Sequence, residues 1–376
     1  PAARYSPHAK PAMRIVVNDI AASYGGALTI LRQFYEYIRG HDSDNEWIFI
    51  LSEPHIEETD RIKVLLRPDI KASGLKKLLF DLFPGRHYID SLEPDVVLSM
   101  QNIITFGVKA PQLTYIHQSI PFADARRFSL LKRDERATAV YQRLIGRIIK
   151  ASARHADGVI VQTEWMREAV AEKSPADIAK IITARPDVTP LPPVGRDIPF
   201  DGSSFFCPTN SEAYKNIGAV IAACRALRRE GITDFRVALT LEQGSVNDPN
   251  IDCIGYQDRA GMAYHYSSSV LLFPSYIETI GLPLAEARCF GTPIIAADRR
   301  YARETLEGYD NAYYFDPFAP CGPAELMKSA VMGAMRRTDV NKENKQTPPA
   351  DSGWKKVYEY ILGFKCNKHR SSSNGR

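Results

Sequence analysis

Short apolar runs alternate with amphipathic segments along most of the 376-residue chain. Each run ends at a polar residue, a proline or a glycine, as buried strands of a parallel sheet do. The first run covers residues 13–18 and leads into a turn containing Gly25 and Gly26, with a helix expected through about Arg39. A strand followed by a Gly-rich turn and a helix is typical of the start of a Rossmann-like domain.

The same alternation predicts the elements that follow. Further strands are expected at residues 47–51, 63–67, 95–99, 113–117 and 158–162, and helices at 73–82 and 164–173, the latter with Thr163 as N-cap. The region from Arg126 to His155 is expected to be one long basic helical segment. A second series predicts strands at 205–207, 235–241, 251–254, 270–273 and 293–296, and helices at 216–229, 258–264 and from Pro283 to Gly291.

Five prolines between Pro186 and Pro199 exclude a helix or a central strand there. The chain is also too long for one ordinary hydrophobic core. We therefore predict an α/β protein with two Rossmann-like domains. The expected division is an N-terminal domain at 1–190, a linker at 191–200, a second domain at 201–350, and a final helix with a disordered tail at 351–376.

Composition favours a soluble globular protein, with 44% hydrophobic and 24% charged residues. The sequence contains no run of about 20 apolar residues and no apolar signal-peptide core near its start. Its six cysteines are scattered singly through the second half, which indicates reduced thiols. We expect a cytoplasmic protein.

The net charge of +4 is unevenly distributed. The block from Arg126 to Arg154 holds nine Lys and Arg residues against two acidic ones, a net of +7, so the rest of the chain sums to −3. An apolar stripe at Leu144, Ile145, Ile148 and Ile149 runs along the same segment. This pattern indicates either a core helix with a solvated face or a surface that docks on an anionic membrane.

Candidate chemistry concentrates between Phe273 and Ala297. Glu278 follows a predicted buried strand, and Glu286 lies eight positions on, in the following helix. Between them Thr279, Ile280, Gly281 and Leu282 should present backbone N–H groups at the positive end of a helix, which suits a phosphate or diphosphate. A carboxylate beside such a site suits sugar hydroxyls, so together they favour a nucleotide sugar. The alternative is that Glu278 caps the helix and Glu286 is a solvated helix residue.

Five other residues have both a functional and a structural interpretation. Gly25 and Gly26 would let the backbone approach a ligand or would form a plain tight turn. His117 ends a predicted strand, at the edge where parallel sheets bind ligands, but a lone histidine is often structural. Lys215 would meet a diphosphate or simply lie at the surface. Tyr256 would stack on a base or would pack after a strand.

The central stretch resembles the Glu-x7-Glu signature of retaining glycosyltransferases of family 4, which lies in a PS-x-x-E-G-F-G-L-P-x-x-E-A frame. The chain departs from it at Thr279, where the family has glycine. A second family frame, G-R-x-x-x-x-K-[GN], is matched at Lys215 and Asn216, but Asn210 occupies the place of the arginine. The segment YIHQSIPF around His117 also resembles the family. The residues matched in the first frame are Pro274, Ser275, Glu278, Gly281, Leu282, Pro283, Glu286 and Ala287.

This resemblance implies a GT-B fold, with two Rossmann-like domains facing a cleft and a C-terminal helix crossing back to the first domain. It implies retaining, metal-independent transfer from a UDP- or GDP-sugar co-substrate, with no further cofactor. Glu286 would bind the ribose, Glu278 the sugar hydroxyls, Lys215 the diphosphate, and His117 the donor sugar. Tyr256 would face the nucleotide base. Another basic residue, backbone N–H groups or Thr209 would substitute for the arginine missing at Asn210, or donor binding would be weaker.

The acceptor implied by the resemblance is a glycan or a lipid-linked saccharide of bacterial surface-polysaccharide or lipopolysaccharide assembly. Such an acceptor would place the enzyme at the inner face of the membrane, with the Arg126–Arg154 block docked on anionic lipid. Two rival functions remain open, a catalytically silent nucleotide-sugar-binding subunit and a UDP-sugar 2-epimerase. A nucleic-acid-binding function is not expected, because the basic block lacks interleaved aromatic residues.

Overall fold

The computed structural model describes residues 11–23, 25–124, 126–188, 190–194, 198–338 and 353–371, the last seven by their backbone only. The chain divides into two compact units. The first unit comprises residues 1–118, 147–187 and 351–376, and the second comprises 119–146 and 188–350. The predicted domain limits at 190 and 201 stay a prediction.

The first unit is built on a seven-stranded sheet in the order β3-β2-β1-β4-β5-β6-β7, with all neighbouring strands parallel. Its strands are β1 (Arg14–Asn18), β2 (Glu46–Leu51), β3 (Ile62–Leu66), β4 (Val96–Ser99), β5 (Gln112–Ile116), β6 (Gly158–Val161) and β7 (Ile181–Thr183). Its helices are α1 (Gly25–His41), α2 (Pro68–Lys71), α3 (Gly74–Leu82), α4 (Gly85–Asp90), α6 (Gly146–His155), α7 (Glu164–Lys173) and α14 (Gly353–Ser371).

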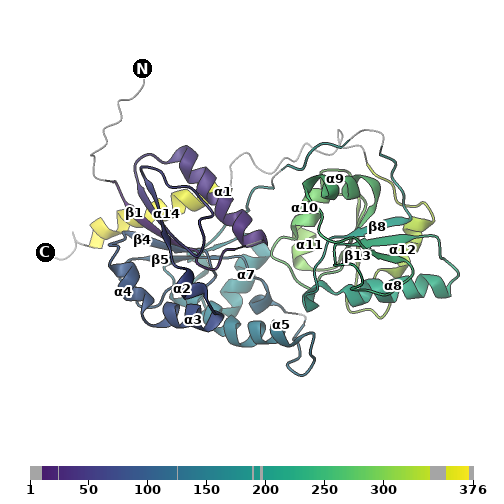
Figure 1. The fold of residues 1–376 in the computed structure, drawn as a ribbon, viewed down its shortest axis with the longest axis horizontal. Helices are drawn as coiled ribbons and strands as arrows, with labels where there is room; N and C mark the ends of the chain where they lie inside the picture. The colour runs from purple at the N-terminus through teal and green to yellow at the C-terminus, as the bar shows by residue number, and fades with distance from the viewer. Residues whose placement is uncertain are drawn as a thin grey trace, which may run out of the picture. The chain divides into compact units, whose positions relative to one another are not determined.

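The C-terminal helix α14 completes the first unit, as Figure 1 shows. The side chain of Trp354 is 2% exposed, and its ring centroid lies 5.5 Å from that of Phe34 in α1 and 5.8 Å from that of Tyr115 in β5. The indole Nε1 donates a 3.2 Å hydrogen bond to Gln33 Oε1. The prediction that the last helix crosses back to the first domain is therefore confirmed.

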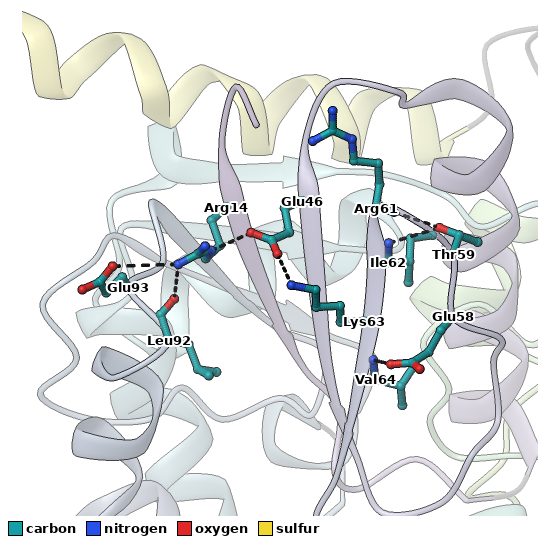
Figure 2. A network of polar contacts seen from close by, with 10 residues as sticks. All are labelled: Arg14, Glu46, Glu58, Thr59, Arg61, Ile62, Lys63, Val64, Leu92 and Glu93. Carbon is teal, nitrogen blue, oxygen red and sulfur yellow. Dashed lines mark hydrogen bonds and ion pairs between the residues drawn. The ribbon is translucent and has the colours of Figure 1, made fainter. Parts of the chain in front are cut away.

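An ionic network ties together the amino-terminal ends of three strands of this sheet (Figure 2). The Glu46 carboxylate at the start of β2 lies 2.7 Å from Arg14 of β1 and 2.7 Å from Lys63 of β3. Burial raises the pKa of Glu46, but the two cations outweigh it and hold that pKa below its usual range. The network holds together the amino-terminal ends of these strands. Open parallel sheets bind ligands in the loops that follow the carboxyl ends, so a ligand site of this sheet is expected at the other end of the strands.

The second unit carries a six-stranded parallel sheet in the order β10-β9-β8-β11-β12-β13. Both sheets therefore share the third-second-first-fourth-fifth-sixth strand order of Rossmann-like folds, which confirms the predicted architecture of each unit. Its strands are β8 (Ser204–Cys207), β9 (Arg236–Leu239), β10 (Ile251–Cys253), β11 (Val270–Phe273), β12 (Ile294–Ala297) and β13 (Ala312–Phe315). Its helices are α5 (Arg136–Val140), α8 (Ile217–Arg229), α9 (Arg259–Ser268), α10 (Leu282–Arg288), α11 (Arg300–Thr305) and α12 (Ala324–Val331).

The predicted continuous helix from Arg126 to His155 is wrong. Residues 126–129 are irregular, and helix begins only with the five-residue α5. A π-helical turn over Tyr141–Ile145 then separates α5 from α6. The upstream part cannot be helical, because Glu135 Oε2 accepts the Ser129 backbone N–H and Arg143 donates to the Phe128 carbonyl. These tertiary bonds replace the helix ladder.

Other differences are local. Thr163 holds the N-cap position of α7 with extended backbone, but its side chain makes no capping hydrogen bond. The sequence analysis missed six short elements, namely β7, β13, α2, α4, α11 and α12. The described residues among 186–199 form neither helix nor strand, as expected. The polar segment at 338–350 lies outside the described residues beyond Thr338, as does the tail beyond Ser371. No helix in the described part of the chain is long and apolar enough to cross a membrane.

Candidate functional site

The strand order of the second sheet reverses between β8 and β11, which are parallel neighbours with Phe206 opposite Leu271. The loop after β8 runs toward α8, whereas the loop after β11 runs toward α10 on the other side of this reversal. Open α/β sheets bind ligands at such a switch point. Lys215 lies in the first of these loops, and Glu278 lies in the second.

The two loops meet through an ion pair. Lys215 Nζ lies 2.7 Å from Glu278 Oε1, and both side chains are about 15% exposed. Burial lowers the pKa of Lys215, but the Glu278 carboxylate outweighs it and raises that pKa above its ordinary value. The Tyr276 backbone N–H also donates a 2.8 Å hydrogen bond to the Tyr214 carbonyl. Lys215 is therefore not a freely solvated surface lysine.

The turn before α10 requires glycine. Gly281 has φ +75° at the N-cap of α10, and a Cβ there would lie 3.2 Å from both Leu284 and Phe273. Two buried hydroxyls fix the preceding loop, since Thr305 donates to the Ile280 carbonyl at 2.6 Å and Tyr301 donates to the Ser275 carbonyl at 2.7 Å. The N-cap residue Gly281 has no side chain with which to cap this helix, and the Glu278 carboxylate pairs with Lys215 instead, which argues against the interpretation of Glu278 as a capping residue.

Glu286 lies in α10 and is half-buried. Its Oε2 accepts a 2.9 Å hydrogen bond from the hydroxyl of Tyr266, which belongs to α9. Burial raises the pKa of Glu286, and the Tyr266 hydrogen bond and the charge of Arg259 oppose that rise in part. Glu286 is thus an oriented carboxylate with one oxygen left for another donor, rather than a solvated helix residue.

Thr209 and Asn210 follow β8. The Thr209 backbone exchanges two hydrogen bonds with the hydroxyl of Thr240, at 2.7 and 2.8 Å. Asn210 is exposed, and its Oδ1 accepts the Glu212 backbone N–H at 3.0 Å. Asn210 thus shapes the loop that leads to Lys215, and it supplies no cation in place of the family arginine.

Tyr256 follows β10 and is 90% exposed. The interpretation of Tyr256 as a packing residue is therefore wrong. Its ring is available to a planar ligand.

Three predicted site residues belong to the first unit. Gly25 and Gly26 begin α1, with φ +62° at Gly25 and open space around both α-carbons. His117 follows β5, where Asn102 Oδ1 accepts its backbone N–H at 2.9 Å and Asn102 Nδ2 lies 3.3 Å from Nε2. Burial lowers the pKa of His117 to about 4, so its ring is neutral near pH 7. Among the described residues, His117 Nδ1 has no hydrogen-bond partner.

The structure thus brings Thr209, Asn210, Lys215, Glu278 and the 279–282 turn to one switch point, with Glu286 in the helix that follows the turn. His117, Gly25 and Gly26 belong to the first unit. The sequence analysis missed Tyr266 as the residue that orients Glu286, because no short-range pattern links positions twenty residues apart.

A buried polar cluster of the first unit was also missed. Asn18 ends β1 and donates to Thr105 at 3.3 Å, and Thr105 donates to the buried Asp81 at 3.1 Å. Asp19 follows Asn18, is 1% exposed, and has a pKa that burial raises to about 8 against the opposing charge of Lys77. Two polar residues directly after an apolar strand were the available sequence signal.

Residues 244–347 match the model of the family described as "Glycosyl transferases group 1". No curated protein matches the chain. Several solved structures share its fold. Sucrose-phosphate synthase from Thermosynechococcus elongatus is 17% identical with a TM-score of 0.63, over 96% of this chain and 98% of that one.

Anabaena HepE in complex with UDP-glucose is 13% identical with a TM-score of 0.61, over 96% of this chain and 99% of that one. WaaG, a glycosyltransferase involved in lipopolysaccharide biosynthesis, is 11% identical with a TM-score of 0.62, over 93% of this chain and 100% of that one. At these identities the likeness concerns the fold, and it confirms the predicted GT-B class.

Proposed function

From the match of residues 244–347 to the group 1 glycosyl transferases, we propose which reaction this chain performs. It moves a sugar from a nucleoside diphosphate donor to a glycan or lipid-linked saccharide, with retention of anomeric configuration and without a metal ion. The reaction serves polysaccharide or lipopolysaccharide assembly.

The observation that carries this proposal is the 2.7 Å pair between Lys215 and Glu278 at the switch point of the second sheet. In this pair the Lys215 and Glu278 side chains satisfy each other by a hydrogen bond. A nucleotide sugar offers both a better anion for the ammonium, its diphosphate, and better donors for the carboxylate, its sugar hydroxyls. The pair is thus a preformed receptor for the two halves of one donor molecule.

The chemistry follows from where charge develops. As the bond between the sugar and the diphosphate breaks, negative charge grows on the departing phosphate, where Lys215 and the backbone N–H groups of the first turn of α10 stabilise it. The acceptor hydroxyl attacks from the same face and passes its proton to that phosphate. Glu286 holds the ribose with the oxygen that Tyr266 leaves unused, and His117 contacts the donor sugar as a neutral imidazole.

UDP-glucose is the first donor to test, because HepE, which shares the fold, holds it in its crystal structure. The assay measures release of UDP or GDP from a panel of nucleotide sugars, with and without bacterial membrane extract as acceptor source. We expect release that depends on the extract and that is lost in Lys215→Ala. Binding without release would indicate a silent subunit, and acceptor-independent conversion of a UDP-sugar would indicate an epimerase.

In this proposal the Arg126–Arg154 block docks the enzyme on the anionic inner face of the membrane through its exposed residues 131–133. Leu131 is 91% exposed and is followed by two exposed cations, Lys132, whose Nζ also lies 3.6 Å from Glu135 Oε1, and Arg133. Other basic residues are used internally, since Arg126 pairs with Glu135 and Arg143 bonds to the Phe128 carbonyl. An exposed leucine beside solvent-facing cations suits the interface of an anionic bilayer.

Co-sedimentation with liposomes tests this docking. We expect binding to phosphatidylserine vesicles at low salt, loss of binding at high salt, and no binding to phosphatidylcholine vesicles. Lys132→Glu with Arg133→Glu should abolish binding, whereas the matched pair Arg225→Glu with Arg229→Glu on the exposed face of α8 should not. Equal binding to both kinds of vesicle contradicts the proposed membrane role.

A further inference from the structure

The loop that carries Glu278 is contacted by a distant part of the chain. Residues 119–146 lie between β5 and α6 in sequence, yet they form part of the second unit. They fall outside the family match at 244–347. Within this segment, Arg126 reaches the loop that follows β11.

Arg126 stacks on Tyr276. Its guanidinium carbon lies 4.2 Å from the centroid of the Tyr276 ring, and a guanidinium at this distance is attracted to the π-face. The guanidinium also donates a 2.8 Å hydrogen bond to Glu135 Oε1, and Glu135 Oε2 accepts the Ser129 backbone N–H at 2.8 Å. The Glu135 side chain is 6% exposed. Arg126 is therefore locked in place before it meets the tyrosine.

Tyr276 is in turn connected to both halves of the Lys215–Glu278 pair. It lies two residues before Glu278, and its backbone N–H bonds to the carbonyl of Tyr214, the residue before Lys215, at 2.8 Å. Arg299 Nε donates to the Tyr276 carbonyl at 3.2 Å. The Tyr276 ring also stacks on Phe318, with centroids 5.3 Å apart and planes 22° apart. A displacement of Tyr276 would move the Glu278 and Lys215 backbones together.

We propose that Arg126 is a positioning residue, which through Tyr276 holds Lys215 and Glu278 in the geometry that the transfer reaction needs. This inference rests on the proposed function, in which that pair receives the donor. A charged pair acts on a reacting bond only at defined distances, and a misplacement of about 1 Å can cost roughly 100-fold in rate. Arg126 touches neither Lys215 nor Glu278, so its effect passes through the tyrosine.

The first measurement is kinetic and uses UDP release from UDP-glucose. We expect Arg126→Ala to lower kcat by about 10- to 100-fold while the KM for UDP-glucose changes by less than about threefold. Arg126→Lys keeps the charge but not the planar stack, so it should recover only part of the loss. The matched control Arg127→Ala removes the exposed neighbour of the same charge and should leave kcat unchanged.

A double-mutant cycle tests the route. If Arg126 acts through the ring, Arg126→Ala should cost nothing further in a Tyr276→Ala background, because the contact is already absent. Independent, multiplicative losses would overturn the proposal, and so would a loss in Arg126→Ala no larger than that in Arg127→Ala. Thermal unfolding of each variant identifies any loss of activity that comes from unfolding alone, and such a result also counts against a positioning role.

A second readout does not need turnover. Hydrogen–deuterium exchange should become faster in peptides covering 274–282 in Arg126→Ala but not in Arg127→Ala. If the wild-type protein releases no nucleotide, the proposed function fails, and exchange alone decides whether Arg126 holds this loop. Unchanged exchange in Arg126→Ala overturns the positioning role whatever the activity.

Discussion

The hydroxyl of Tyr266 donates a 2.9 Å hydrogen bond to one carboxylate oxygen of Glu286, from a neighbouring helix of the second unit. The bond fixes the carboxylate in one orientation. It also occupies one of the two oxygens, which leaves the other for a ligand hydroxyl. A carboxylate prepared in this way binds a vicinal diol at a smaller entropic cost than a free side chain would.

Glu286→Ala should weaken the binding of UDP while the fold survives. A hydrogen bond to a charged acceptor is worth about 1.5–3 kcal/mol, or roughly 10- to 150-fold in affinity. Calorimetric titration of UDP measures the change. Tyr266→Phe is the matched comparison, because it keeps the carboxylate and loses only its orienting donor, so its effect should be smaller. A folded Glu286→Ala protein with wild-type affinity would contradict the ribose-binding role.

The same residue predicts a pH dependence. Burial raises the pKa of Glu286, so this carboxyl takes up a proton at a higher pH than an exposed glutamate does. The ionised form is the better acceptor for ribose hydroxyls, and affinity for UDP should therefore fall on acidification while exposed glutamates are still charged. Glu286→Gln should remove this step from a plot of affinity against pH, and an unchanged step would assign it to another group.

Lys215→Ala should lower kcat more than it raises the KM for the donor. The ammonium faces charge that grows as the diphosphate leaves, so the interaction strengthens in the transition state. Loss of such a contact costs roughly 100- to 1000-fold in kcat. Steady-state kinetics with the best donor separates the two parameters. An effect on KM alone would leave Lys215 as a binding residue with no part in bond breaking.

His117→Ala should lower kcat without changing the affinity for UDP, since the proposed nucleotide contacts lie in the second unit. Burial lowers the pKa of His117 to about 4, so the ring stays neutral from pH 5 upward. The pH–rate profile of the wild type should therefore contain no step near 6.5 that disappears in His117→Gln. The appearance of such a step would mean that the imidazole titrates and acts as a general acid or base.

Asp19 predicts a stability change with pH in the opposite sense to a paired carboxylate. Its folded-state pKa is raised by burial to about 8, whereas an unfolded aspartate ionises near 3.8. Between these values the folded state holds the extra proton, so stability falls as pH rises, by up to about 1.4 kcal/mol per pH unit. Asp19→Asn has no carboxyl proton to lose, so its free energy of unfolding should increase relative to that of the wild type as pH rises from 5 to 7.

Urea unfolding of the two proteins at pH 5, 6 and 7 measures this difference. The exposed Asp60→Asn is the matched control, with no expected trend. A constant gap between wild type and Asp19→Asn across this range would show that Asp19 is ionised in the folded protein.

The elements around the candidate site were predictable because local signals agree there. The apolar run before Pro274, the proline at the start of α10, and Gly281 with its positive φ each act within a few residues. Glu278 and Lys215 were identified separately, one from each loop. Their direct pairing was not predicted, since a contact between positions 63 residues apart depends on the parallel pairing of β8 with β11.

The segment after His117 shows the limit of such reasoning. Its spacing of basic and apolar residues predicted one helix, and that spacing holds from Gly146 onward in α6. Upstream of Gly146, the Glu135 carboxylate accepts hydrogen bonds from Arg126 and from the Ser129 backbone N–H. These polar contacts outweigh the helical preference of the same residues. No periodicity carries that information, and the sequence therefore identifies Arg126 only as one charge in a basic block.

The first unit is assembled from three stretches of chain, and the last of them, α14, is made only after the whole second unit. During synthesis Phe34 and Tyr115 therefore emerge from the ribosome long before Trp354, the ring that covers both. All stretches of the second unit, in contrast, precede residue 351. The order of maturation is thus inverted with respect to the order of translation, because the half synthesised first is the half completed last.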